Sequence, residues 1–457
     1  MRIGRFDGKK ILIIHFRVGR TDGVSIEIAS WKKILEGLGA EVKLCSGSVN
    51  SGADFVIDDL EQQLNVKIFD LDENSFGGFK TYNEETFTKT LLEEQLVLEE
   101  GFSMVFESYK PDQLIVSNIF SVGENLPAAG ALTKVLDKFQ IPTLAVHHDF
   151  YWENQRYKKS SSYLVSEQLK KYFPPKRRWI KHCCINTIAQ DELWRRKGIR
   201  GDVLYDTQDF TKPSWKKNNL NHRLIEKFKI DENDILVLQA TRIVRRKNIE
   251  IAISFVDALT KKLNSLSRKI TLYDNRRFVP KKQQAALIIA GYAEERDKKY
   301  LEQLKKYATD KKVKVYFIGD SIKTQSKGNG AKFSLWDIYP YADLITYPSE
   351  HEGFGNQFLE ATFAKKPVVI FEYPVFVKDI KPKGFEVVSF GRKVSYKSDS
   401  GMAMIPQEVL QGAVEQSLEV LTNSRKHYKL VNNNFIIGRL NFSHENTCKK
   451  FMSLLDF

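Results

Sequence analysis

The sequence is poor in cysteine and has no long apolar run. Its four cysteines among 457 residues are Cys45, Cys183, Cys184 and Cys448, and their spacing matches no metal-binding or redox motif. This pattern argues against a disulfide framework and predicts a reducing, cytoplasmic location. No stretch approaches the ~18 consecutive apolar residues that cross a bilayer, so any membrane contact would be peripheral, at the anionic inner leaflet.

Positive charge, in contrast, is abundant. Lysine and arginine (71) outnumber aspartate and glutamate (57), which gives a formal net charge of +14. Such a protein binds nucleic acid, an anionic membrane surface or phosphorylated small molecules. The basic residues are spread along the whole chain, without an arginine-rich tail or alternating basic and aromatic residues. We therefore expect no nucleic-acid partner, and the sequence leaves the oligomeric state open.

Short apolar runs alternate with longer amphipathic segments from end to end. A chain of this length exceeds one ordinary core, so we predict two domains of roughly 200 residues each. Continuous apolar strands separated by helices indicate parallel sheets covered on both faces, and two such blocks indicate two Rossmann-like α/β domains. The predicted strands are residues 9–16, 112–119, 142–149, 182–188, 234–242, 285–292, 313–320, 342–349 and 366–373.

A change in composition marks the boundary between these domains. Between residues 195 and 223 apolar residues become fewer, while Gly, Pro, Asn and Lys become frequent. We place the hinge near residue 210, so that the first domain comprises residues 1–209.

A glycine-rich turn follows the predicted strand 342–349. Ligands of open parallel sheets bind beyond the carboxyl ends of the strands, where helix N-termini present N–H groups. Gly353 and Gly355 permit a tight turn, and the helix begins at Asn356. The backbone N–H groups of Phe354, Gly355 and Asn356 would bind an anion there.

Two glutamates, Glu352 and Glu360, flank this turn. A carboxylate beside bound phosphate would be repelled unless it faces hydroxyl groups, so we interpret both as acceptors for sugar hydroxyls. The alternative is an acidic loop followed by a helix with a solvent-exposed glutamate.

Basic residues follow the predicted strand 234–242. Arg242, Arg245, Arg246 and Lys247 stand between this strand and the next helix, where cations suit a diphosphate that gains negative charge. The alternative is a basic surface turn, which is common.

Another turn, HFRVGRTDG, joins the first strand to a helix predicted over residues 25–39. It contains Gly19, Arg20, Asp22 and Gly23. It matches neither G-x-G-x-x-G nor the P-loop, which disfavours a dinucleotide-dependent oxidoreductase and a P-loop ATPase.

His147, His148 and Asp149 close the strand 142–149 in the segment HHDFYWENQRY. A lone histidine is usually a packed core residue, but this group also suits a ligand site. No third metal ligand stands at a suitable spacing, so we predict no metal site. Tyr151 and Trp152 follow directly and suit an acceptor site.

With these four clusters in this order, the chain resembles the retaining, GT-B-fold glycosyltransferases of glycosyltransferase family 4 (glycosyl transferases group 1). The resemblance covers essentially the whole chain. Residues 347–361, YPSEHEGFGNQFLEA, are similar to the family signature P-S-x-x-E-G-F-G-x-x-x-L-E-A. TRIVRRK (241–247) is similar to its R-x(4)-K segment, residues 24–42 to its first helix, and residues 185–199 to the segment before its hinge.

This resemblance implies two Rossmann-like domains that face each other across a cleft. They would be an acceptor-side domain (1–209) and a donor domain (210–438), followed by a C-terminal helix (439–457) that crosses back to the first domain. The donor would be a GDP- or UDP-linked hexose, of glucose or mannose type, with no cofactor and no metal. The acceptor would be a sugar, a sugar phosphate or a lipid-linked sugar. The segment around His148 also resembles members that build small glycosides from GDP-mannose.

The resemblance also implies roles for individual residues. Glu360 would bind the ribose hydroxyls, Arg242 and Lys247 would neutralise the diphosphate, and the acceptor hydroxyl would attack from the front face. The implied catalytic residues are Glu352, His148, Arg242 and Lys247, the donor-binding residues are Glu360, Gly353, Phe354, Gly355, Asn356 and Gly23, and the acceptor-side residues are His147, Asp149, Tyr151, Trp152, Arg20 and Asp22.

Two departures from the family pattern affect this interpretation. Asp22 precedes Gly23 where members often have paired glycines, so this loop suits the acceptor better than a phosphate. Asp206 stands where many members have asparagine, which leaves the hinge contacts open.

Two other classes of protein stay open. A GT-B-fold sugar phosphorylase or nucleotide-sugar epimerase would share the fold and much of the site. A non-enzymatic basic protein that binds nucleic acid or membranes would show steeply salt-dependent binding, but it would have no use for Glu352 and Glu360 around the turn.

Overall fold

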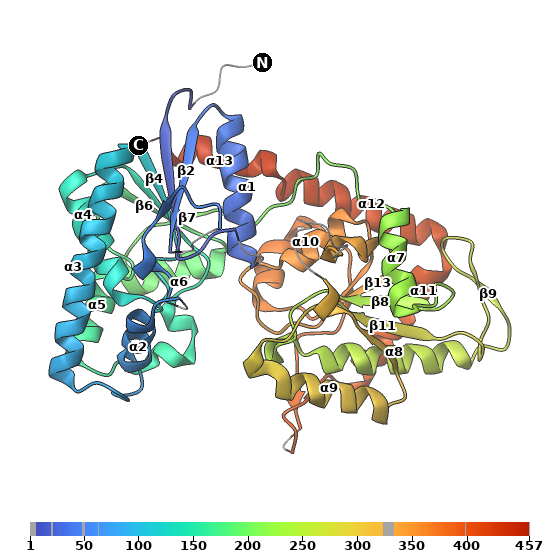
Figure 1. Cartoon of the computed structure of the whole chain (residues 1–457). Helices are drawn as coiled ribbons and strands as arrows, with labels where there is room; N and C mark the ends of the chain where they lie inside the picture. Colours follow the sequence, from blue (N-terminus) through green and yellow to red (C-terminus); the bar gives the residue numbers. More distant parts are fainter. Residues whose placement is uncertain are drawn as a thin grey trace. The chain divides into compact units, whose positions relative to one another are not determined.

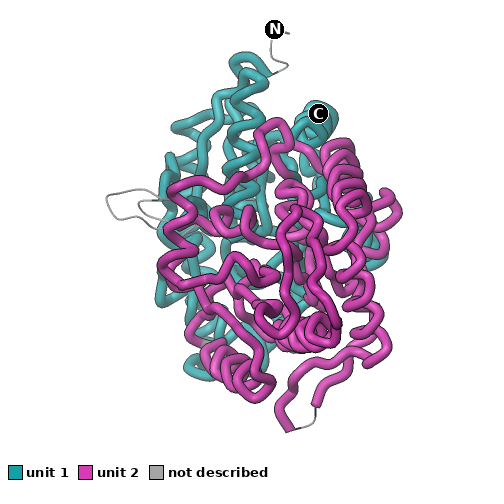
Figure 2. Tube along the Cα trace, turned by 90° about the vertical axis from the view of Figure 1, so that its right-hand side faces the viewer, with its two compact units in different colours: residues 1–207, 444–457 teal, residues 208–443 magenta. Residues whose placement is uncertain are grey.

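The computed structural model describes residues 6–19, 22–47, 51–62, 64–322, 333–397 and 399–456. The chain forms two compact units (Figures 1 and 2). Unit 1 comprises Met1–Thr207 and His444–Phe457, and unit 2 comprises Gln208–Ser443. The C-terminal helix therefore belongs to unit 1. The predicted boundary at residue 439 lies inside the last helix of unit 2, which continues to Asn441.

Unit 1 is built on a seven-stranded parallel sheet with the order β3-β2-β1-β4-β5-β6-β7. Its strands are β1 (Lys10–Ile14), β2 (Glu41–Ser46), β3 (Phe55–Val56), β4 (Gln113–Ser117), β5 (Thr143–His147), β6 (Ile180–Cys184) and β7 (Asp202–Val203). Its helices are α1 (Gly23–Gly37), α2 (Val66–Ser75), α3 (Glu84–Tyr109), α4 (Leu126–Phe139), α5 (Tyr163–Tyr172), α6 (Thr187–Lys197) and α13 (His444–Leu454).

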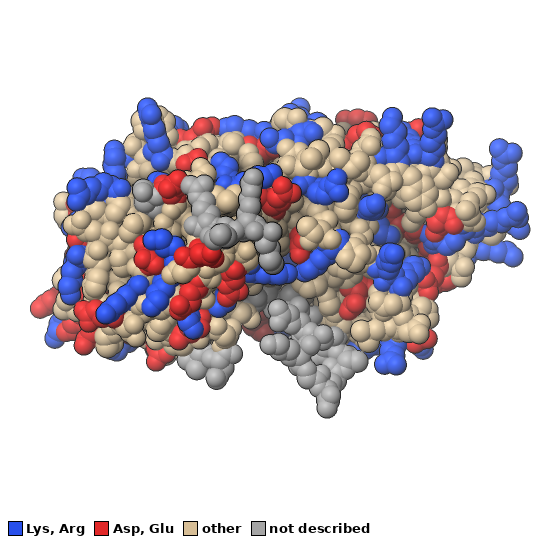
Figure 3. Space-filling view, turned by 90° about the horizontal axis from the view of Figure 1, so that it is seen from above, with Lys and Arg blue, Asp and Glu red and all other residues tan. Residues whose placement is uncertain are grey.

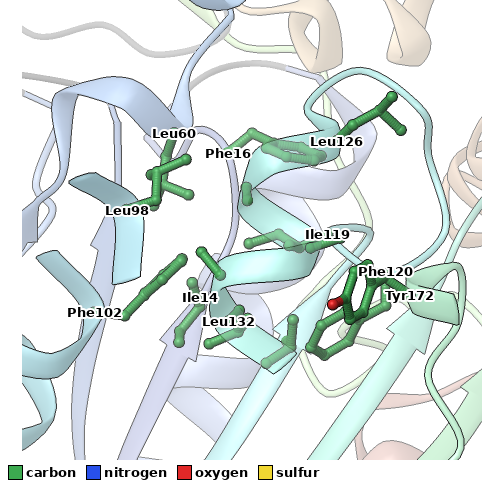
Figure 4. Packing of buried hydrophobic residues seen from close by; sticks show 14 of the residues in the cluster. Ile14, Phe16, Leu60, Leu98, Phe102, Ile119, Phe120, Leu126, Leu132 and Tyr172 are labelled. Carbon is green, nitrogen blue, oxygen red and sulfur yellow. The ribbon is translucent and has the colours of Figure 1, made fainter. Parts of the chain in front are cut away.

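Both faces of this sheet are buried, as the continuous apolar strands predict. Successive side chains of a strand point to opposite faces. Accordingly, Leu12 and Ile14 join a core cluster with α3 and α4, whereas Ile11 and Ile13 join a second cluster with α1 and α13. Figure 4 shows part of the first cluster, in which Phe102 of α3 lies near β1.

Unit 2 repeats the architecture with a six-stranded parallel sheet of order β12-β11-β8-β13-β14-β15. Its strands are β8 (Ile235–Gln239), β11 (Ala285–Ile289), β12 (Lys314–Phe317), β13 (Leu344–Tyr347), β14 (Val368–Ile370) and β15 (Val388–Ser389). Its helices are α7 (Asn219–Phe228), α8 (Ile249–Asn264), α9 (Lys298–Asp310), α10 (Asn356–Phe363), α11 (Gln407–Thr422) and α12 (Ser424–Asn441). Two antiparallel hairpins, β9–β10 (Ile270–Thr271 with Arg277–Phe278) and β16–β17 (Ser395–Tyr396 with Ala403–Met404), complete it.

The predicted strand over residues 182–188 is wrong in its second half. β6 ends at Cys184, and α6 begins at Thr187 because Asn186 caps this helix. The Asn186 side-chain oxygen accepts a hydrogen bond from the Ala189 N–H at 2.7 Å. A cap residue inside an apolar run thus ended the strand early.

The surface carries its excess of cations in a dispersed form. On the face seen in Figure 3, lysine and arginine side chains lie among aspartates and glutamates over much of the surface. None of the described helices combines the length and apolarity needed to cross a membrane.

Candidate functional site

Two of the predicted clusters meet at the carboxyl edge of the unit 2 sheet. β8 and β13 are neighbours in this sheet, so the segments that follow them lie side by side (Figure 1). Lys247, in a short 3-10 turn after β8, forms an ion pair with Glu352, which follows β13. The guanidinium of Arg246 lies 3.2 Å from the other carboxylate oxygen of Glu352. Both oxygens of this carboxylate are therefore engaged by cations.

The electrostatics of this ion pair follow from its burial. Burial alone raises the pKa of Glu352, but Lys247 and Arg246 outweigh it and lower the pKa to about 2. Burial lowers the pKa of Lys247 to about 8, although Glu352 opposes this shift. Lys247 and Glu352 are thus both ionised at neutral pH, and the site holds a net positive charge beside a helix N-terminus.

The glycine turn after Glu352 has the geometry that the sequence predicts. Gly355 adopts φ +132°, and a Cβ atom there would lie 2.2 Å from the hydroxyl of Tyr373. This hydroxyl donates a hydrogen bond to the Phe354 carbonyl at 2.6 Å, which holds the turn in place. Only glycine fits at this position without strain.

Helix α10 starts at Asn356, and no side chain caps its N-terminus. The carboxamide oxygen of Asn356 is buried and has no hydrogen-bond partner within the described part of the chain. An unpaired polar group next to an uncapped helix start suits a polar or anionic ligand. Gly353 and Phe354 form the approach to this helix.

Glu360 extends from the same helix, about one turn further on, and is partly buried. Tyr339 donates a hydrogen bond to it at 2.6 Å. Burial raises the pKa of Glu360 to about 6, although the hydrogen bond from Tyr339 opposes the shift. The Glu360 carboxylate is therefore mostly ionised at neutral pH and accepts hydrogen bonds. It becomes protonated as the pH falls through about 6.

Arg242 does not join the Glu352 ion pair. Its guanidinium lies 2.7 Å from Glu294, and its side chain is 42% exposed. The resemblance implies that Arg242 and Lys247 neutralise a diphosphate, and the structure shows in addition that Arg246 contacts Glu352. The diphosphate role of Arg242 stays a prediction.

In unit 1, His148, which was predicted to contact the transferred sugar, lies at the carboxyl edge of the sheet, directly after β5. Its backbone N–H donates to the side chain of Asn118 at 2.8 Å, and its ring stacks on Trp31 with centroids 5.7 Å apart. Burial and the nearby His15 lower the pKa of His148 to about 3, so its imidazole is neutral. The Nε2 atom of His148 is buried without a hydrogen-bond partner among the described residues, and so is Nδ1 of His147.

His147 points elsewhere. It is 1% exposed, its Nε2 is hydrogen-bonded to Nδ1 of His182 at 3.0 Å, and its ring packs against Phe150. Of the two adjacent histidines, His147 is therefore the one that packs into the core.

The first glycine-rich turn is closed by its own aspartate. Asp22 caps α1: its carboxylate accepts hydrogen bonds from the backbone N–H of Ser25 at 3.2 Å and from the Ser25 hydroxyl at 2.8 Å. Burial is the largest single effect on the pKa of Asp22 and raises it. Arg17 and the hydrogen bonds from Ser25 together outweigh burial, so the pKa is lowered. The negative charge at the start of α1, just before Gly23, disfavours a phosphate there. Arg20 lies outside the described residues.

The remaining acceptor-side predictions are Asp149, Tyr151 and Trp152, which follow His148 in the chain. Asp149 is exposed. Trp152 stacks on Phe150 with centroids 4.2 Å apart, and Tyr151 packs edge-on against Trp152. Much of this aromatic area thus contributes to local packing.

Comparison with known proteins adds to this geometry. A family model described as glycosyl transferases group 1 matches residues 221–387, the region that holds Lys247, Glu352 and Glu360. The mannosylglucosylglycerate synthase of Petrotoga mobilis is 38% identical over 92% of this chain and 95% of the relative. The enzyme of the same name from Thermotoga maritima is 36% identical over 95% of this chain and 97% of the relative. The chain belongs to the group 1 glycosyltransferases.

Solved structures agree on the fold of this glycosyltransferase. A glycosyltransferase from Rickettsia africae superposes with a TM-score of 0.60 over 99% of this chain and 100% of that chain, at 15% identity. Together with the two parallel sheets, this likeness confirms the predicted GT-B fold, and the family confirms the predicted transferase activity.

Several residues that contact the predicted site residues, or lie beside them at the sheet edges, were not among the predictions. His15 closes β1 and donates from Nδ1 to the Ser117 carbonyl at 3.0 Å, and Asn118 follows β4. Both are polar residues that directly follow a strand of a parallel sheet, so the rule applied to the other clusters would also have identified them. Tyr339, which donates a hydrogen bond to Glu360, comes before β13 and does not follow a strand, so the same rule does not identify it.

A buried pair of carboxyl groups was also missed. Glu27 of α1 is 4% exposed and Asp206 is 7% exposed. Burial and the neighbouring Asp206 raise the pKa of Glu27 well above its usual value, and burial with the charge of Asp149 raises that of Asp206 to about 7. The backbone N–H of Thr207 donates to Glu27 at 3.3 Å. The sequence placed Asp206 at the hinge without a partner.

Proposed function

We propose that this glycosyltransferase moves a hexose of mannose type from a GDP- or UDP-linked donor to a hydroxyl group of a small glycoside, with retention at the anomeric carbon and without a metal ion. The relatives' names describe the synthesis of mannosylglucosylglycerate. From these names we take glucosylglycerate as the first acceptor to test and GDP-mannose as the first donor.

The observation that carries this proposal is the contact of Glu352 with the buried Lys247 and the half-exposed Arg246, beside the start of α10. When the bond between the anomeric carbon and the phosphate oxygen breaks, the diphosphate gains negative charge. Lys247 and Arg246 stabilise that charge in a position fixed beforehand by Glu352. These cations do the work that a divalent ion does in other transferases.

The remaining residues position the donor and the acceptor. Glu360 accepts hydrogen bonds from the ribose hydroxyls, and the backbone at Gly355 and Asn356 faces the phosphates. Neutral His148 contacts the transferred sugar. The acceptor oxygen bonds to the anomeric carbon on the face from which the diphosphate leaves, and the acceptor proton passes to the departing phosphate oxygen.

A transfer assay tests the proposal. The protein is incubated with glucosylglycerate and either GDP-mannose or UDP-glucose in the presence of EDTA, and the product is examined by NMR. We expect a disaccharide product whose new linkage keeps the donor's anomeric configuration. Glu352→Gln should abolish it, whereas Glu302→Gln, an exposed glutamate on α9, should not. Turnover that requires inorganic phosphate and no nucleotide would instead identify a phosphorylase.

A further inference from the structure

Unit 2 contains a hollow of about 420 Å³ that none of the proposed donor contacts uses. It lies between α8, α9, α11 and the β16–β17 hairpin, which is the orange loop that extends past α9 in Figure 1. Its volume falls in the range of pockets that hold small molecules. We call it the lysine hollow, because Lys261, Lys262, Lys311 and Lys397 line it.

The lysine hollow carries more positive than negative charge. Asp257 lies 2.9 Å from Lys261 and 3.3 Å from Lys311, so one carboxylate serves two ammonium groups. Lys262 is paired with Glu415 at 2.6 Å. Lys397 forms no ion pair within the described ranges, and its ammonium lies 5.8 Å from the centre of the Tyr307 ring. Like charges gathered around one hollow repel one another, and a bound dianion would relieve that repulsion.

The uncharged walls of the hollow suit a sugar. The hydroxyls of Ser254 and Tyr307 are hydrogen-bonded at 2.9 Å and lie on one wall. Ala258 and Leu410 provide apolar surface on which a sugar ring can rest. Asp257 has a second role here, because a carboxylate accepts hydrogen bonds from sugar hydroxyls.

We propose that the lysine hollow is a second binding site, for a phosphorylated sugar. Lys397 and Lys311 bind the phosphate group. Asp257, Ser254 and Tyr307 bind hydroxyl groups of the ring. This site is separate from the Glu352 ion pair and does not depend on which sugar the enzyme transfers.

The β16–β17 hairpin connects the hollow with the Glu352 site. Tyr396, the last residue of β16, contacts Glu350, and the next residue, Lys397, lines the hollow. The backbone N–H of Glu350 in turn donates to the Arg246 carbonyl at 3.2 Å. A ligand that holds Lys397 therefore restrains the hairpin that supports the Arg246 segment, so occupation of the hollow changes nucleotide affinity, and the reverse.

Calorimetric titration of the full chain with glucose 6-phosphate, with glucose as the uncharged control, tests the site. We expect saturable binding of the phosphate ester only. Lys397→Gln should weaken it at least tenfold. Lys305→Gln, which removes an α9 lysine paired with Glu302 outside the hollow, should leave it unchanged, and so should Glu352→Gln.

Two results would overturn the proposal. One is the lack of saturable binding to the wild type. The other is binding that Glu352→Gln abolishes and Lys397→Gln keeps, since the ester would then occupy the Glu352 site.

The connection between the lysine hollow and the Glu352 site is tested by nucleotide affinity. Saturating glucose 6-phosphate should change the Kd of GDP or UDP at least threefold in the wild type, and less in Tyr396→Phe, which lacks the hydroxyl that contacts Glu350. An unchanged nucleotide affinity in the wild type would refute the connection through the hairpin.

Discussion

The two units place different kinds of side chain after equivalent strands. In unit 2, Lys247, Arg246 and Glu352 form an ion-paired group that stays charged at neutral pH. In unit 1, burial lowers the pKa of His15 to about 4 and that of His148 to about 3, so both imidazoles are neutral. The same sheet edge thus carries fixed charge in one unit and uncharged hydrogen-bonding groups in the other.

The two sites differ in charge because only Glu352 has groups of opposite charge close enough to offset its burial. Glu352 receives two cations from the loop after the adjacent strand, and they outweigh the cost of its burial. His148 stacks beneath Trp31 of α1 and has His15 as a neighbour, so burial is not offset. The comparison supports the proposal that unit 2 binds an anion and unit 1 contacts uncharged hydroxyls.

Removal of the charge on Glu352 should give the largest effect. Glu352→Gln leaves the Lys247 ammonium buried without its counter-charge, which costs about 3–5 kcal/mol of unfolding free energy. Misplaced cations should also lower kcat about 100-fold or more. Urea unfolding and initial rates measure both, with Glu302→Gln as the matched control. A kcat near that of the wild type would show that the ion pair is only structural.

The acid dependence of this pair follows from the lowered pKa of Glu352. A carboxylate whose folded-state pKa is lowered stabilises the fold above its unfolded pKa. The contribution is therefore retained at neutral pH and lost as the pH falls from about 4.5 towards 2. The difference in stability between wild type and Glu352→Gln should shrink over that window.

Asp206→Asn should have an effect of opposite sign in unit 1. The pKa of Asp206 is raised to about 7, so its ionisation destabilises the fold increasingly as the pH rises from about 4 to 7. Asparagine cannot ionise, so the variant should be more stable than wild type by about 2–4 kcal/mol at pH 8 and by less at pH 5. Urea unfolding at both pH values measures this, with the exposed Asp202→Asn as the control. A gain that is equal at both pH values would contradict a protonated Asp206.

Glu360→Gln should weaken nucleotide binding by about tenfold, since one charged acceptor for the ribose is lost. Because the pKa of Glu360 is raised to about 6, wild-type affinity for GDP or UDP should fall below pH 6, whereas the affinity of the variant should not. Tyr339→Phe removes a hydrogen bond that lowers this pKa, so it should move the transition to higher pH. Titrations between pH 5 and 8 measure all three proteins, and identical profiles would exclude Glu360 from the nucleotide site.

The smallest effect is expected for Arg242→Gln. Arg242 is exposed and paired with Glu294, and exposed ion pairs contribute at most about 1 kcal/mol. If Arg242 keeps this ion pair when the donor binds, kcat and KM for the donor should change less than threefold in the variant. A loss near 100-fold would show that Arg242 leaves Glu294 to bind the diphosphate, as the sequence resemblance implies.

The hydrophobic pattern predicted most of both sheets, because a buried parallel strand is a continuous apolar run. β2 and the short edge strands were missed. β2 begins with the exposed Glu41 and contains the half-buried Lys43, so its pattern differs from that of the central strands. The end of β6 was placed too late, because a capping asparagine inside an apolar run leaves the run unbroken.

For the site, the sequence by itself singled out three segments, the EGFG turn, the TRIVRRK segment and the HHD strand end, and their roles stay predictions. This was possible because strand ends and glycines are local features that can be recognised one at a time. The tertiary structure alone decided the partners. It brought Arg246 to Glu352, placed His147 in the core, and paired Asp206 with Glu27 across about 180 residues. These pairings depend on strand order and on the side-chain directions of distant segments, and local sequence contains neither.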